Sequence, residues 1–147
     1  MRLILQRTSL VLFSIVALFL VWFGLTYGMA QEMLSFHAAA LPDEVRGAAK
    51  PLYLALMHLI GAASLALGLA GLYVIVFPLR RGLPGAATVL LLTNGLVFVV
   101  AGLTAEQLAA ATGAPTSWHL MGIGMAITLT AYLAHGVAGR MSGADAR

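Results

Sequence analysis

The sequence predicts an all-α integral membrane protein whose four transmembrane helices form an up-and-down bundle. Of its 147 residues, 61% are hydrophobic and only 9% are charged, whereas a soluble domain typically carries about a quarter charged residues. Four long apolar runs follow one another along the chain, and each has roughly the 20 residues that cross a bilayer as a helix. We therefore expect a single transmembrane domain over residues 1–147.

The spans are expected at about 9–28, 52–77, 84–103 and 116–137. The first run is longer than the ~7–15-residue apolar core of a secretory signal, which favours a retained helix. Pro51 precedes the second run and Pro84 opens the third, and proline suits the first turn of a helix. Pro42 and Gly47 interrupt residues 29–50, so this longest connection is expected to lack a continuous helix.

The charges predict the orientation of the chain in the membrane. Arginines lie at residues 2 and 7, 80 and 81, and 140 and 147, whereas segments 29–50 and 104–115 are acidic on balance. Because positive charges remain in the cytoplasm, both termini are expected there, in a cell membrane that is the inner membrane of a bacterium. The lipid bilayer is then the main partner, and nucleic acid is not expected because there is no basic face.

Two short motifs indicate an internal repeat. The sequence MHLIG at 57–61 is matched by WHLMG at 118–122, and each motif opens an apolar run. Glu32 and Glu106 stand at the ends of the first and third runs, each four residues after a glycine. Because each half contains two spans, the halves would enter the membrane the same way up. We therefore expect a parallel two-fold repeat of spans one and two with spans three and four.

The repeat singles out His58, His119, Glu32 and Glu106 as the candidate binding residues. Ionisable side chains in a membrane span are costly and usually face the bundle interior, a partner or water. In an antiparallel bundle, all four could converge just below the outer surface. The sequence therefore predicts a polar pocket near the outer face that binds a cofactor, a metal or a small lipophilic ligand.

Three chemistries fit two imidazoles and two carboxylates, and the sequence leaves them open. His58 and His119 could ligate the iron of haem b from facing helices. The same histidines could bind a divalent metal together with the carboxylates. Each Glu–His pair could instead hold a quinone or other lipophilic molecule and relay protons, because histidine titrates near neutral pH. The absence of cysteine excludes thiolate metal sites and iron–sulfur clusters.

A simpler interpretation needs no ligand. Each histidine would hydrogen-bond to a neighbouring helix, and each glutamate would be solvated. Six small or polar residues are expected to serve helix packing, within the bundle or against another subunit: Gly61, Ser64, Gly68, Gly71, Asn94 and Gly122. The alternative function is then a non-catalytic accessory or assembly subunit of a larger membrane complex, or a homo-oligomer. A transporter is less favoured, because no charged residue lies at mid-membrane to couple to an ion.

Overall fold

The computed structural model describes residues 1–144, which form helices and contain no strand. The elements are α1 (Arg2–Gly28), α2 (Ser35–Ala38), α3 (Asp43–Val74), the π-helix η1 (Ile75–Leu79), α4 (Ala86–Thr112) and α5 (His119–Ala144). Four helices are long and apolar enough to cross a membrane: α1, α3 together with η1, α4, and α5 as far as Met141. The predicted all-α class with four apolar helices is confirmed. Arg147 lies outside the described residues.

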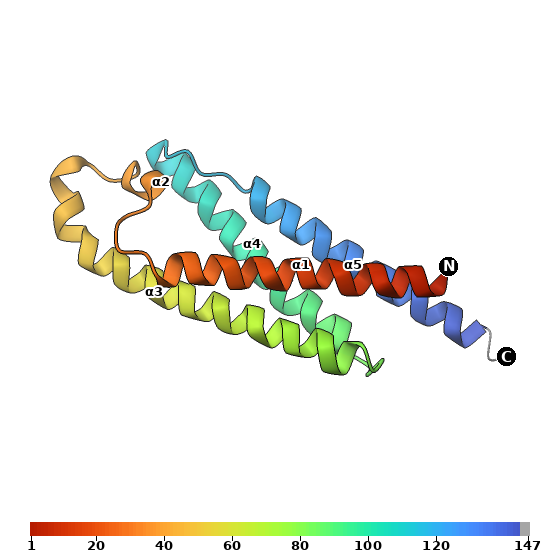
Figure 1. Cartoon of the computed structure of the whole chain (residues 1–147). Helices are drawn as coiled ribbons and strands as arrows, with labels where there is room; N and C mark the ends of the chain where they lie inside the picture. Colours follow the sequence, from red (N-terminus) through yellow and green to blue (C-terminus); the bar gives the residue numbers. More distant parts are fainter. Residues whose placement is uncertain (145–147) are drawn as a thin grey trace.

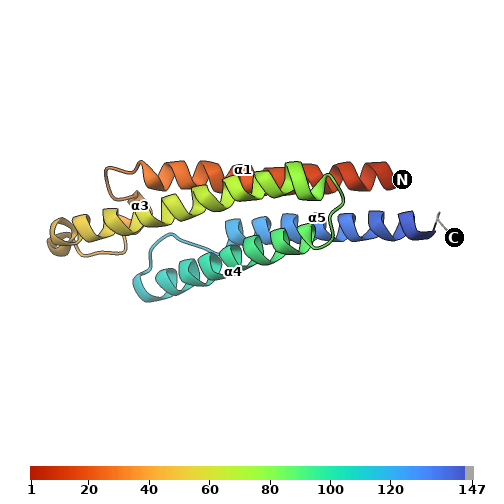
Figure 2. The ribbon, with the colours of Figure 1, turned by 90° about the horizontal axis from the view of Figure 1, so that it is seen from below.

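Successive long helices run in opposite directions, so the molecule has two ends (Figure 1). We call the end with residue 1 and the turn 80–85 the terminal end, and the end with residues 29–42 and 113–118 the loop end. α1 packs most extensively against α3 and then against α5, and α4 packs against α5. Figure 2 shows the α1–α3 pair lying over the α4–α5 pair. α3 and α4 lie close at the terminal end and diverge toward the loop end (Figure 1).

Helix α3 begins at Asp43, directly after Pro42 and well before the predicted start of the second span, and it continues through Gly47, so the expected interruption at Gly47 was wrong. The acidic Asp43 and Glu44 lie in the first turn, where negative charge interacts favourably with the helix dipole. Arg46 pairs with Asp43. Pro51 removes only one backbone hydrogen bond of the helix, and the turns on either side of it continue.

Helix α4 is also longer than predicted, because it continues past residue 103 to Thr112. The extension is rich in alanine at 105 and 109–111, and alanine has the highest helix propensity. Gly113 ends the helix with a φ of 69°, a left-handed conformation that glycine adopts at little cost. Glu106 therefore lies on a helix and not in a loop.

The turn between α3 and α4 begins with the π-helix η1. Pro78 has no N–H to donate to the preceding turn, and the hydrogen bonds widen there to a five-residue spacing. The Arg80 N–H donates to the Ile75 carbonyl at 3.2 Å, and the Leu83 N–H donates to the Pro78 carbonyl at 3.0 Å. This arrangement carries the chain from α3 into the turn 80–85.

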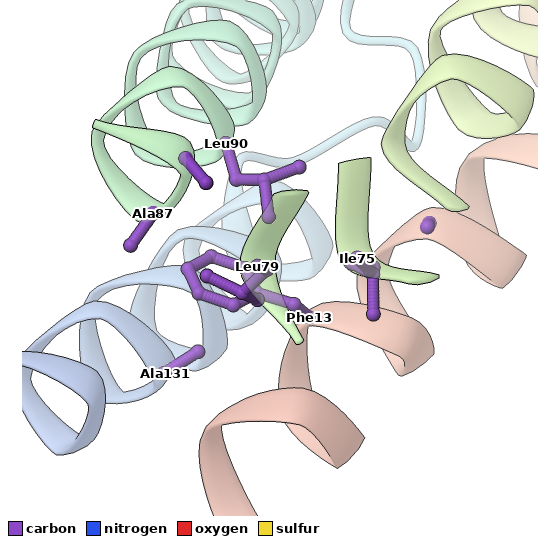
Figure 3. Packing of buried hydrophobic residues seen from close by; sticks show 8 residues of the cluster. Phe13, Ile75, Leu79, Ala87, Leu90 and Ala131 are labelled. Atoms are coloured by element: carbon purple, nitrogen blue, oxygen red, sulfur yellow. The ribbon is translucent and has the colours of Figure 1, made fainter. Parts of the chain in front are cut away.

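The apolar core lies at the terminal end, where all four long helices meet. Phe13 of α1 is fully buried and packs with Leu79 of η1, Leu90 of α4 and Ala131 of α5 (Figure 3). Such packing is the main attraction between helices in a membrane, because lipid tails are as apolar as the side chains. The two helix pairs extend from this shared core toward the loop end.

The α1–α3 pair is held together by glycine contacts. A Cβ on Gly24 would lie 2.5 Å from the nitrogen of Leu65, and one on Gly68 would lie 2.7 Å from the nitrogen of Val21. Gly28 and Gly61 meet in the same way nearer the loop end. Small residues in such positions allow helix backbones to approach closely. The α1–α3 crossing therefore leaves no space between the helices.

Candidate functional site

An open groove of about 470 Å³ lies along the α4–α5 pair in the half of the molecule toward the loop end. Nine residues line it: Phe98, Val99, Gly102, Leu103, Glu106, Trp118, Met121, Gly122 and Met125. On each helix they recur at intervals of three and four residues, which places them on one face. Glu106 is the one ionisable residue among them, so the groove is an apolar surface with a single carboxylate.

The groove exists because the α4–α5 crossing is filled differently from the α1–α3 crossing. A Cβ on Gly102 would lie 3.4 Å from the Cβ of Met121, an ordinary contact between side chains. A Cβ on Gly122 would lie 2.5 Å from the Trp118 ring, so the indole occupies the space that Gly122 leaves free. At Gly102 the backbone of α4 therefore faces side chains of the α5 side, whereas Gly28 and Gly61 bring the backbones of α1 and α3 into contact.

Phe98 closes the groove on the side toward the terminal end. Its side chain is 2% exposed, and its ring centroid lies 6.2 Å from that of Phe19 on α1. The ring also covers Gly124, where a Cβ would lie 2.6 Å from it. The groove therefore ends against packed aromatic side chains.

Glu106 lies at the end of the groove nearest the loop end. Its side chain is exposed, and within residues 1–144 it forms neither an ion pair nor a hydrogen bond. Trp118 is 50% exposed, and its ring stacks on His119 with centroids 4.9 Å apart and planes at 21°. His119 in turn shares a hydrogen bond between its Nδ1 and the Ser117 hydroxyl at 3.0 Å. The mouth of the groove thus combines a free carboxylate with a supported indole.

His58 and Glu32 have partners within the α1–α3 side of the molecule. The Nε2 of His58 donates to the Ala30 carbonyl at 2.9 Å, which ties the start of the 29–42 connection to α3. Glu32 forms an ion pair with Lys50. His58 and His119 are both accessible at the surface. His58 on α3 and His119 on α5 therefore have separate hydrogen-bond partners, which lie in different connections.

A metal or haem could use only the ring nitrogens that remain free, Nδ1 of His58 and Nε2 of His119. Within the described residues, no group of three or more His, Cys, Asp or Glu side chains is arranged to hold a metal ion. The shared pocket of His58, His119, Glu32 and Glu106 stays a prediction. Of these four residues, Glu106 is the one that lines the groove.

A polar cluster that was not predicted lies at the loop end, where the connection 29–42 meets α3. The Leu34 N–H donates to the Tyr53 hydroxyl at 3.2 Å, and this hydroxyl lies 2.8 Å from Nδ1 of His37. The hydroxyl can accept the Leu34 amide proton and still share a hydrogen bond with Nδ1, as the donor where Nδ1 is unprotonated. Burial lowers the pKa of His37 below its usual 6.5, because a buried imidazole resists gaining charge. The neutral ring thus anchors α2 to α3.

This cluster could not be read from spacing, because its residues come from a short helix and from a distant turn of α3. In the sequence, His37 is a single histidine within a connection and belongs to neither of the two repeated motifs. The ring of His37 also meets Tyr27 of α1 edge-on, with centroids 6.3 Å apart. The sequence feature that could have indicated this cluster is the pair Tyr27 and Tyr53, which lie toward the loop end of α1 and α3.

The residues expected to serve packing are mostly buried. Gly61, Ser64, Gly68 and Gly71 form the buried stripe of α3. Asn94 is 4% exposed on α4, and its side-chain amide makes no hydrogen bond with residues 1–144.

Comparison of the chain with protein-family models, with curated proteins and with solved structures gives no match.

Proposed function

We propose that this chain is a small polytopic membrane protein that binds a small lipophilic molecule in the groove between α4 and α5. The observation that carries the proposal is the groove itself, apolar along its length and bearing one carboxylate at its end. Its volume of about 470 Å³ falls within the ~300–1,000 Å³ typical of small-molecule sites. Met121 and Met125 supply flexible side chains that adapt to ligands of different shape.

The proposed orientation places the loop end outside the cytoplasm. In the described residues, the terminal end carries five arginines: Arg2, Arg7, Arg80, Arg81 and Arg140. The loop end carries Glu32, Asp43, Glu44 and Glu106, with Arg46 and Lys50 as the basic residues. This asymmetry favours a cytoplasmic location for both termini. Glu106 and Trp118 then lie near the outer membrane interface, where indoles are enriched.

We also propose that the two halves are a parallel repeat in which one crossing is closed and the other is open. Gly28 and Gly102 occupy corresponding positions, and so do Gly61 and Gly122. Gly28 lies against Gly61, whereas Gly102 lies against Met121, beside Gly122. The α1–α3 pair would supply rigidity, and the α4–α5 pair would supply the binding groove. His58 and Glu32 would then hold the connection 29–42 in place without contacting the ligand.

The alternative of an accessory subunit receives less support from the packing residues. A Cβ on Gly68 would meet the backbone of α1, and Asn94 is buried within the chain. Neither residue lies on the surface that a partner subunit would contact. Their replacement would disturb this chain before it disturbed an assembly.

Two neighbouring valines allow a direct test of the groove. Val99 lines it, whereas Val100 lies outside it and is 53% exposed. We would photolabel the chain in lipid nanodiscs with a diazirine-bearing aliphatic alcohol and map the labelled residues by mass spectrometry. Labelling should concentrate on Met121 and Met125, and Val99→Phe should reduce it strongly while Val100→Phe leaves it unchanged. Labelling spread evenly over all lipid-facing residues, or equal in the two variants, would contradict the proposal.

A further inference from the structure

We infer that the occupant of the groove is an amphipathic cation, whose positive head lies between Glu106 and Trp118 and whose apolar part extends toward Phe98. This inference rests on the proposed function, because it names the class of molecule that the same groove would bind. It depends on three features: the charge at the mouth, the exposed indole, and the apolar surface beyond them.

The charge at the mouth is negative and is not neutralised by the protein. Glu106 has no ion-pair partner within the described residues. The basic side chains of the loop end are already engaged, Arg46 with Asp43 and Lys50 with Glu32. The other arginines of the described residues lie at the opposite end of the helices. A bound cation would therefore supply the missing counter-charge, whereas an anionic head would be repelled.

The indole provides a second element of recognition for a cation. Trp118 lines the same groove as Glu106, and half of its surface is accessible. His119 stacks on the ring and limits its movement. A cation over an indole face within about 6 Å of its centroid is attracted by the ring electrons, and tryptophan is the most effective residue for this contact. A tertiary or quaternary ammonium group can use both the indole and the carboxylate.

The remainder of the groove suits an uncharged, apolar tail. Phe98, Met121 and Met125 provide the surface there, and Gly102 presents no side chain that would obstruct it. A second charged group on the ligand would find no partner among the residues that line the groove. The lining therefore favours a molecule that carries one positive charge at one end.

The test compares two competitors that differ only in charge. 5-Phenylpentyl-trimethylammonium and its neutral carbon isostere, in which a tert-butyl group replaces the ammonium, would displace the diazirine photolabel from Met121 and Met125 in zwitterionic nanodiscs. We expect the cation to compete more strongly. Glu106→Gln should weaken competition by the cation about ten-fold and leave competition by the neutral isostere unchanged. High salt should weaken the cation alone, because exposed charges are screened.

Glu44→Gln is the matched control, because Glu44 is also an exposed carboxylate of the loop end and does not line the groove. It should leave both competitors unchanged. Equal competition by the two molecules, unaffected by Glu106→Gln, would overturn the inference and leave the proposed function standing. An equal effect of the two Glu→Gln variants would also overturn it, because a general surface potential would then explain the preference. Absence of any labelling in the groove would overturn both proposals.

Discussion

Gly28 and Gly61 bring the backbones of α1 and α3 into direct contact, since a Cβ on Gly61 would lie 2.2 Å from the Gly28 nitrogen. No side chain can be placed between the two helices at this point. The contact lies on the α3 turn that follows His58, whose Nε2 binds the Ala30 carbonyl. The close approach of the helices and the anchoring of the connection 29–42 are therefore parts of one arrangement.

Replacement of Gly61 by alanine should destabilise the protein, because the added methyl group meets backbone atoms that cannot move independently. Overpacking of this kind typically costs about 1–3 kcal/mol. We expect a lower thermal denaturation midpoint in detergent, followed by loss of α-helical circular dichroism. Gly136→Ala is the control, because Gly136 lies in α5 with nothing within 4 Å of an added Cβ. That variant should be neutral or slightly stabilising.

Replacement of Phe13 by alanine should destabilise the terminal end, where the ring packs against Leu79, Leu90 and Ala131. Removal of a fully buried phenylalanine typically costs about 3–5 kcal/mol. In a membrane the loss comes chiefly from packing, because lipid also solvates an apolar side chain. Leu18→Ala is the control, since Leu18 is 55% exposed on the same helix. Equal denaturation midpoints for the two variants would contradict this assignment of the core.

Acidification should loosen the connection 29–42 at His37. Burial in the folded protein lowers the pKa of His37 below its usual 6.5. A form in which the connection 29–42 has detached and exposed His37 therefore binds the proton more readily than the folded form. The stability contributed by the neutral ring is therefore present above the usual pKa and is lost as the pH falls through the lowered pKa. In the protonated imidazolium Nδ1 is a donor, so the Tyr53 hydroxyl could then only accept from it.

Hydrogen exchange at the Leu34 amide gives the measurement, because this N–H donates to Tyr53. Its protection should be greater at about pH 8 than at about pH 5, after correction for the intrinsic rate of exchange. Tyr53→Phe removes the hydroxyl and should abolish the pH dependence. Protection that rises on acidification would have the wrong sign and would rule out this role for His37.

The helices of this fold could be predicted from composition, whereas their ends could not. Apolar runs identify segments that cross a membrane, but α3 and α4 continue into polar segments where hydropathy gives no signal. Asp43 begins α3 ahead of a proline, and alanines carry α4 beyond Glu106. First-turn charges favour the start of α3, and the helix propensity of alanine favours the extension of α4. Mean hydropathy along the chain detects neither effect.

The candidate site was only partly accessible to prediction for a related reason. The similarity of the two motifs identified Glu106 and the glycines, but a sequence match cannot show whether a helix crossing is closed or open. The two motifs also differ at their first residue, which is Met57 in one and Trp118 in the other. Met57 is 2% exposed, whereas Trp118 is 50% exposed. The same motif position is therefore buried in α3 and accessible in the groove.

Replacement of Gly122 by leucine should displace the Trp118 indole and remove one wall of the groove. A Cβ at this position would lie 2.5 Å from the ring, and the ring is the more movable partner because it is half exposed. The chain has two tryptophans, so a Trp22→Phe background leaves Trp118 as the single reporter. Its emission should shift in wavelength, and photolabelling of Met121 and Met125 should fall by about an order of magnitude, equivalent to about 1.4 kcal/mol of binding free energy.

Gly139→Leu is the matched control for this experiment, because Gly139 lies in the same helix with no atom within 4 Å of an added Cβ. It adds the same side chain away from the groove and should change neither the emission nor the labelling. Unchanged Trp118 emission in Gly122→Leu would mean that the indole does not rest on this glycine. Changed emission with unchanged labelling would show instead that the indole is not a wall of the binding site, and the ligand would then have to be held by α4 and the methionines alone.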